Sequence, residues 1–165
     1  MITKFNYFKN LILESKTLIG EDLIDRLYLL SQELKNNNYI VKLSGGDLIA
    51  HNEYINLEMT LCEDEISVDS WNTLEFTYVG FNIDMIEVPI KYRGQGHMKN
   101  LLTIITKFCD KYNILLRLSA QAQDDLTDID KLVNVYKVFN FKPKAKKKKY
   151  NKSELVIMER KPKKI

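Results

Sequence analysis

The sequence predicts an α/β fold of the α+β kind, in which helices pack on a mixed, mostly antiparallel central sheet. Residues 39–90 are short β-branched and aromatic segments separated by turn residues, which is typical of an antiparallel meander. Apolar residues recur at helical spacing before and after this region. A strand, a glycine-containing turn, a helix and a second strand follow one another over residues 82–120, and this order indicates a parallel crossover.

The composition predicts one soluble, cytoplasmic domain over residues 1–165. With 45% apolar and 28% charged residues, the chain resembles ordinary globular proteins and is long enough to bury one core. Cys62 and Cys109 lack a partner motif, so we expect neither a disulfide framework nor a metal site. We find neither a signal peptide nor an uncharged run of about 18 residues, so no membrane span is expected.

Charge is distributed unevenly along the chain. Residues 142–164 contain 11 basic and two acidic residues, which leaves 14 basic and 20 acidic residues in the remainder. The acidic remainder favours a cationic substrate. The lysine run Lys146–Lys149 has three interpretations: a solvated hairpin, a contact for a phosphate group, or a patch that binds nucleic acid or an acidic partner.

The N-terminal part, residues 1–38, is expected to be helical. An amphipathic helix over residues 21–35 is indicated by five apolar residues at helical spacing, Leu23, Ile24, Leu27, Leu30 and Leu34. Residues 1–20 have a poorer period and are expected to be partly helical. Turns of the following meander are predicted at Ser44–Gly46 and at Trp71–Asn72.

The last meander strand is predicted at Asn82–Ile90, with even-numbered residues on one face and odd-numbered residues on the other. It leads into the turn Lys91–Gly96. A helix of about four turns follows, because apolar residues recur from Met98 to Tyr112. Ile114–Ala120 is nearly unbroken in its apolar character, which predicts a strand buried on both faces.

A second helix is predicted from an apolar stripe that opens after Thr127-Asp128, a plausible N-cap, and ends at Asn140. The basic C-terminal region, residues 142–165, is expected to contain a final strand at Leu155–Met158. Asn140 tolerates the left-handed conformation that ends many helices.

The glycines of the central turn point to an anion site. A helix N-terminus presents unpaired N–H groups and a partial positive charge, and Gly94 and Gly96 let a phosphate approach them. Taken alone, two glycines before a helix are weak evidence, and a simple tight turn is the alternative. The sequence around them decides between the two interpretations.

This context resembles the GNAT superfamily of acyl-CoA N-acyltransferases over about residues 83–141. The phosphate-binding signature of that family is similar to Val88-Pro89-Ile90-Lys91-Tyr92-Arg93-Gly94-Gln95-Gly96-His97-Met98. A second landmark is similar to Tyr136-Lys137-Val138-Phe139-Asn140-Phe141. Two positions depart from the family pattern: Met98 replaces Gly or Ala, and Asn140 replaces Gly.

The resemblance implies a sheet with helices on both faces and a splay between the fourth and fifth strands. Residues 91–141 would form the core that binds acetyl-CoA. The backbones of Ile86 and Val88 would pair with the pantetheine arm. The pyrophosphate would be wrapped by the turn residues Arg93, Gly94, Gln95, Gly96, His97 and Met98.

Three residues are candidates for proton transfer. The resemblance implies that Tyr136 protonates the departing sulfur, although a tyrosine on an apolar helix face is often plain core. Asp84 is the preferred base because it precedes Val88 by four residues on the same predicted face, and a solvent-facing aspartate is the alternative. Glu87 is the second candidate, and it points to the opposite face unless a bulge intervenes.

The expected function is transfer of an acetyl group from acetyl-CoA to a primary amine by direct attack. The acceptor would be a small molecule or a protein lysine or N-terminus, and the protein would be a monomer or homodimer. The alternative is a non-catalytic binding protein of the same fold, whose lysine-rich C-terminal region contacts nucleic acid or an acidic partner.

Overall fold

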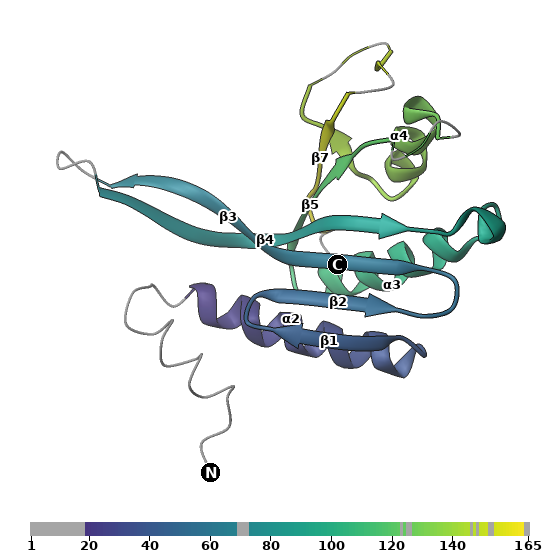
Figure 1. Cartoon of the computed structure of the whole chain (residues 1–165). Helices are drawn as coiled ribbons and strands as arrows, with labels where there is room; N and C mark the ends of the chain where they lie inside the picture. Colours follow the sequence, from purple (N-terminus) through teal and green to yellow (C-terminus); the bar gives the residue numbers. More distant parts are fainter. Residues whose placement is uncertain are drawn as a thin grey trace.

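The computed structural model describes residues 19–68, 73–122, 124, 127–145, 147, 149–151 and 154–163 (Figure 1). Two of the predicted features lie outside these residues. They are the partly helical segment before residue 19 and the turn at Trp71–Asn72.

The described elements alternate between helices and one sheet. In chain order they are α2 (Ile19–Asn36), β1 (Ile40–Ser44), β2 (Asp47–His51), β3 (Asn56–Val68), β4 (Thr73–Glu87), a 3₁₀ turn (Ile90–Tyr92), α3 (His97–Lys111), β5 (Leu115–Ala120), α4 (Ile129–Val138), β6 (Lys142–Pro143) and β7 (Val156–Arg160). None of the described helices is long and apolar enough to cross a membrane.

The sheet is mixed and mostly antiparallel, as the sequence predicts. Its seven strands lie in the order β1-β2-β3-β4-β5-β7-β6. Only β4 and β5 pair in parallel, and α3 connects them, which confirms the predicted crossover. The other five pairs are antiparallel.

The N-terminal elements follow from local sequence signals. Helix α2 spans the predicted segment and buries its apolar stripe, the residues Leu23, Leu27, Leu30 and Leu34. Strands β1 and β2 form a hairpin around Gly45, whose φ of 60° is left-handed, so the predicted turn is confirmed. In β2, Leu48 and Ala50 are fully buried while their neighbours are exposed, which is the alternation of a half-buried strand.

Helices α3 and α4 also agree with the sequence. Helix α3 buries its apolar stripe, and its fully buried Cys109 is a core residue. Helix α4 begins at the predicted cap, where the Asp128 carboxylate accepts hydrogen bonds from the backbone N–H groups of Asp130 (2.9 Å) and Lys131 (3.3 Å). It ends before Asn140, whose φ of 66° is left-handed, as predicted.

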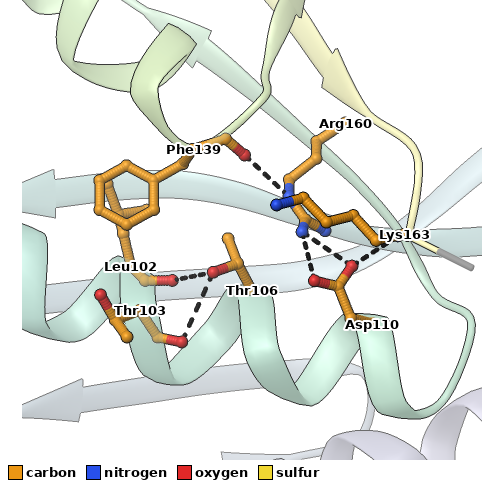
Figure 2. A network of polar contacts seen from close by, with 7 residues as sticks. All are labelled: Leu102, Thr103, Thr106, Asp110, Phe139, Arg160 and Lys163. Atoms are coloured by element: carbon orange, nitrogen blue, oxygen red, sulfur yellow. Dashed lines mark hydrogen bonds and ion pairs between the residues drawn. The ribbon is translucent and has the colours of Figure 1, made fainter. Parts of the chain in front are cut away.

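A buried charge network fixes the C-terminal ends of α3 and α4 against β7 (Figure 2). Arg160 of β7 is 2% exposed, and its Nη2 donates to both carboxylate oxygens of Asp110 at 2.7 and 2.6 Å. Its Nε donates to the carbonyl of Phe139 at 2.8 Å, just after α4. Burial raises the pKa of Asp110, but the hydrogen bonds from Arg160 and the Lys163 amide outweigh it, so the pKa lies below its usual range.

Strand β4 differs from the prediction in its end and in its faces. It ends at Glu87, and residues 90–92 form a 3₁₀ turn where strand was predicted. Its register against β3 pairs Met59 with Ile83 but Glu58 with Met85, so Asp84 is the extra residue of a β-bulge. The predicted alternation beyond Asp84 is therefore wrong.

The bulge changes which residues of β4 face the core. Ile83 pairs with the buried Met59, and Ile86 pairs with the buried Leu57, so both side chains point to the apolar side. The uninterrupted alternation had placed these two isoleucines on opposite faces. One inserted residue reverses the faces of every later position, which no periodicity in the sequence reveals.

Strands β4 and β5 separate where the bulge occurs. Their pairing ends at Ile83 and Leu118, although β4 continues to Glu87 and β5 continues to Ala120 (Figure 1). The splay between the fourth and fifth strands is therefore present. Among the described strands, none pairs with the edge of β4 beyond Ile83 on the β5 side.

Candidate active site

A cleft of about 670 Å³ lies where β4 and β5 separate. Its wall on the β4 side is the end of β4 and the turn before α3. Its other wall is the end of β5, the following connection and one side of α4. Its lining includes most of the residues singled out from the sequence: Asp84, Ile86, Glu87, Val88, Arg93, Gly94, Gly96, His97, Met98 and Tyr136.

The turn at the start of α3 has the geometry of an anion site. Gly94 and Gly96 have left-handed φ values of 79° and 88°, and Gly96 is the N-cap of α3 without any capping side chain. The first helical hydrogen bond is donated by Asn100 to Gly96, so the preceding amides have no partner within the helix. A Cβ atom at either glycine would meet nothing within 4 Å, so the approach is open.

Arg93 joins the two walls of the cleft. Its Nε donates to the Val88 carbonyl at 3.1 Å, and its Nη2 forms an ion pair with the Asp124 carboxylate at 2.7 Å. Asp124 lies in the connection between β5 and α4, which Thr127 braces through a hydrogen bond of 2.7 Å to the same carboxylate. The arginine of the turn thereby holds the opposite wall.

The other turn residues have separate surroundings. The Gln95 amide donates to the Lys91 carbonyl at 3.1 Å, which closes the turn, and Gln95 does not line the cleft. The His97 ring stacks on Tyr54, with centroids 4.4 Å apart and planes 7° apart. Met98 is partly buried, packs against the core and also lines the cleft.

Tyr136 is buried on α4 and lines the cleft. It is 5% exposed, and its ring meets Phe141 edge-on at a centroid distance of 5.9 Å. Burial raises the pKa of Tyr136 to about 12. The hydroxyl therefore carries its proton throughout the neutral range.

Both candidate carboxylates line the cleft and are exposed. Asp84 accepts a hydrogen bond from the Asn82 amide at 2.5 Å, and Glu87 accepts one from the Asn56 amide at 3.1 Å. Because Asp84 is the bulge residue, it no longer belongs to the regular alternation that relates it to Val88. The structure brings both carboxylates to the same cleft as Tyr136.

Several residues that line the cleft belong to no motif that would mark them as site residues in the sequence. Ser119, Gln121, Thr127 and Lys131 line the cleft from the β5 side. The apolar run of β5 predicted burial on both faces, which is wrong, because burial alternates along the strand and Ser119 is exposed. On the second face Leu115 and Arg117 are half-buried, and Ser119 lines the cleft.

The described residues of the lysine run, Lys147 and Lys149, do not line the cleft, and Lys147 is paired. Lys147 forms an ion pair of 2.5 Å with Glu154, and Lys144 lies 3.8 Å from Glu159. Lys146 and Lys148 are outside the described residues. Among the described residues, no cluster of three or more His, Cys, Asp or Glu side chains is placed to hold a metal ion.

Comparison with known proteins finds similarity in solved structures. No protein-family model and no curated protein matches the chain. AtaTR bound with acetyl-CoA matches with a TM-score of 0.38 and 11% identity, covering 78% of this chain and 74% of that chain. A mutant of the AtaT toxin, bound to the C-terminus of the antitoxin AtaR and acetyl-CoA, matches with a TM-score of 0.34 and 9% identity, covering 78% and 72%.

Proposed function

We propose that this protein transfers an acetyl group from acetyl-CoA to a primary amine of a small molecule or protein. One observation supports this function above others. The cleft combines an uncapped helix N-terminus, an unpaired strand edge and a buried, protonated tyrosine at the place where β4 and β5 separate.

The phosphate end of the substrate fits the start of α3. The free amides after Gly96 and the positive end of the helix dipole attract a pyrophosphate, and the left-handed glycines leave the approach open. Arg93 lies beside the turn, where its ion pair with Asp124 holds the guanidinium in place. These groups would hold coenzyme A through its phosphates with backbone donors.

The pantetheine arm fits the free edge of β4. Ile86 of β4 and Val88, which follows the strand, line the cleft beyond the last pair with β5. The Val88 carbonyl accepts a hydrogen bond from Arg93, and the remaining backbone N–H and C=O groups of this edge need partners. The amides of pantetheine can supply them in the manner of an added strand. The thioester then lies in the gap between β4 and β5.

The reaction needs two proton transfers. The amine nitrogen attacks the thioester carbon, so a C–N bond forms while the C–S bond breaks and the thiolate of coenzyme A departs. Tyr136 gives its proton to the sulfur, and a carboxylate takes the proton lost by the amine. In this proposal Asp84 is the base, because it lines the cleft from the bulge at the point of separation.

Replacing each carboxylate in turn tests the choice of base. Asp84→Asn should lower kcat by at least about tenfold, while Glu87→Gln, its matched control on the same strand, should remain within about threefold of wild type. Steady-state rates against the best acceptor measure both. The reverse pattern would assign the role to Glu87.

Thermal melting with acetyl-CoA tests the proposal as a whole. A ligand at 100 times its Kd stabilises the native state by about 2.7 kcal/mol, which raises Tm by about 5–10 °C in a chain of this size. The absence of a shift at millimolar acetyl-CoA would contradict acetyl-CoA binding. A screen of polyamines, aminoglycosides and lysine peptides then identifies the acceptor.

A pair of glycine variants separates cofactor binding from backbone strain. Gly94→Ala and Gly45→Ala both place a side chain at a left-handed φ, 79° and 60°, and both new methyl groups meet open space. Only Gly94 lies in the proposed phosphate turn. Gly94→Ala should therefore reduce the acetyl-CoA shift, and Gly45→Ala should preserve it.

A further inference from the structure

A second hollow lies beside the C-terminal end of α4. It has a volume of about 490 Å³ and shares no lining residue with the cleft. Positions 128, 131, 132, 135 and 136 of the α4 region line the cleft, whereas positions 137 and 140 line the hollow. The hollow is therefore a separate site, whose argument does not depend on acetyl transfer.

The hollow has an apolar floor and a cationic rim. Phe141 is 1% exposed and Tyr150 is 6% exposed, so these two aromatic side chains form its base. The rim is formed by three exposed lysines: Lys137, Lys142 and Lys147. These lysines come from the end of α4, from β6 and from the segment after it, and the fold alone brings them together.

Hydrogen bonds hold the floor of the hollow in place. The Tyr150 amide donates to the Asp130 carboxylate at 3.2 Å, and the Tyr150 hydroxyl donates to the Ala145 carbonyl at 3.2 Å. Strand β6 pairs with β7 through Lys142 and Glu159. The segment that carries the rim is thus anchored to α4 and to the sheet.

Among the described residues, two of the three rim charges have no acidic partner, and the third is paired. Lys147 forms an ion pair with the half-buried Glu154, while the Lys147 side chain stays half exposed. Lys137 contacts the Asn134 side chain at 3.5 Å. Within the described part of the chain, no carboxylate forms an ion pair with Lys137 or Lys142.

We propose that this hollow binds the sugar–phosphate backbone of a single-stranded nucleic acid. Ammonium groups on flexible stems bind phosphates as point charges, and three lysines around one hollow can contact phosphates of the same strand. The apolar floor accepts a sugar or a base edge. Further lysines along residues 142–164, a region with nine more basic than acidic residues, continue the attraction beyond the hollow.

Fluorescence anisotropy with a labelled 12-nucleotide single strand, as RNA and as DNA, tests this proposal. The full chain carrying Lys137→Gln, Lys142→Gln and Lys147→Gln should bind at least about tenfold more weakly than wild type at about 0.1 M salt. Its slope of log affinity against log salt should fall by about two, since each phosphate contact on a single strand contributes about 0.7.

The matched control removes three exposed lysines elsewhere, through Lys35→Gln, Lys42→Gln and Lys107→Gln, with the same change of net charge. It should bind within about twofold of wild type. An equal loss in both triple variants would show a nonspecific charge effect and overturn the site. Because all six side chains are exposed, both variants should melt at the temperature of the wild type. Unchanged melting temperatures then exclude unfolding as the cause of weaker binding.

Two competitors test the class of ligand. Pyrophosphate should displace the labelled strand only at concentrations at least about 100-fold above the Kd of the strand. A 12-residue polyglutamate should compete no better than pyrophosphate. If pyrophosphate competes as well as the unlabelled strand does, the ligand of the hollow is a small phosphate. If polyglutamate competes as well as the unlabelled strand does, the ligand is an acidic protein segment. Either result would overturn the proposal.

Discussion

Tyr136 shows how one side chain can combine a core position with a place in the cleft. Its ring is buried against Phe141, and its side chain also lines the space between β4 and β5. Burial disfavours the phenolate, and this raises the pKa to about 12. The same burial that stabilises the fold keeps the hydroxyl protonated, as a donor to a thiolate requires.

Tyr136→Phe should lower kcat by about 10²-fold while the acetyl-CoA melting shift stays within about 1 °C of wild type. The substitution removes the proposed proton donor but keeps the ring and its packing. Steady-state kinetics and melting with acetyl-CoA provide the two measurements. An unchanged kcat would remove Tyr136 from the mechanism.

Tyr136 also predicts how stability changes at alkaline pH. An unfolded tyrosine loses its proton near its ordinary pKa of 10.0, whereas folded Tyr136 retains its proton up to about 12. Between these values the unfolded state binds fewer protons, so the free energy of unfolding falls as pH rises, by about 1.4 kcal/mol per pH unit. Below pH 10 this residue contributes no pH dependence.

The measurement is urea unfolding at pH 8, 10 and 11 for wild type and Tyr136→Phe. Wild type should lose about 1 kcal/mol more than the variant between pH 10 and pH 11, because the variant has no proton to lose there. Parallel losses in the two proteins would show that Tyr136 is not the buried group responsible.

At the scale of elements, the Arg160 network connects α3, the end of α4 and β7 (Figure 2). Through the Phe139 carbonyl it fixes the chain three residues after Tyr136, and through Asp110 it fixes the C-terminal end of α3. Helix α3, whose start borders the cleft, and helix α4, one side of which lines it, are thereby both held at their C-terminal ends by one buried guanidinium.

Asp110→Ala should lower the free energy of unfolding by about 3–5 kcal/mol, because it leaves the Arg160 charge buried without a counter-charge. Arg160→Met should lower the free energy of unfolding by less than Asp110→Ala does. The carboxylate it leaves behind, Asp110, is more exposed than Arg160 and still accepts a hydrogen bond from the Lys163 amide. The double variant should recover part of the loss of Asp110→Ala. Urea unfolding of the three variants checks this order, and strictly additive losses would contradict the coupling.

At Gly80, β4 lies so close to β5 that a side chain would not fit. A Cβ atom at this position would collide with the Leu115 carbonyl and lie 2.8 Å from the Leu115 Cβ, within a pairing of only four residue pairs. Gly80→Ala should therefore lower the free energy of unfolding by about 1–3 kcal/mol. It should also reduce the acetyl-CoA shift, because the parallel pairing that positions the gap must move.

The control for Gly80→Ala is Gly46→Ala. Its new methyl group meets only the Leu61 side chain at 3.2 Å, and this side chain can adjust. Gly46→Ala should cost under about 1 kcal/mol in urea unfolding and keep the acetyl-CoA shift. Equal costs in the two variants would show that the β4–β5 contact has no special constraint.

For the whole molecule, the elements that the sequence predicts well are those fixed by short-range chemistry. The apolar stripes of α2, α3 and α4, the cap at Asp128 and the left-handed Asn140 all depend on residues within a few positions of one another. The crossover between β4 and β5 follows from the order of these elements.

The faces of β4 and the surroundings of β5 could not be predicted in this way. The bulge at Asp84 depends on the register of β4 against β3, and the cleft that Ser119 lines depends on where β4 and β5 separate. Register is a property of two segments that are distant in the sequence, so the period of either segment alone does not contain it.

The sequence by itself determined the order of strands and helices, the glycine turn at the start of α3 and the presence of a tyrosine on α4. Only the tertiary structure decided that Arg93 meets Asp124, that Arg160 meets Asp110 and that three lysines surround a second hollow. Local periodicity comes from the geometry of one element, whereas these contacts join side chains from different elements. Their meeting is fixed by how the sheet and its helices pack together.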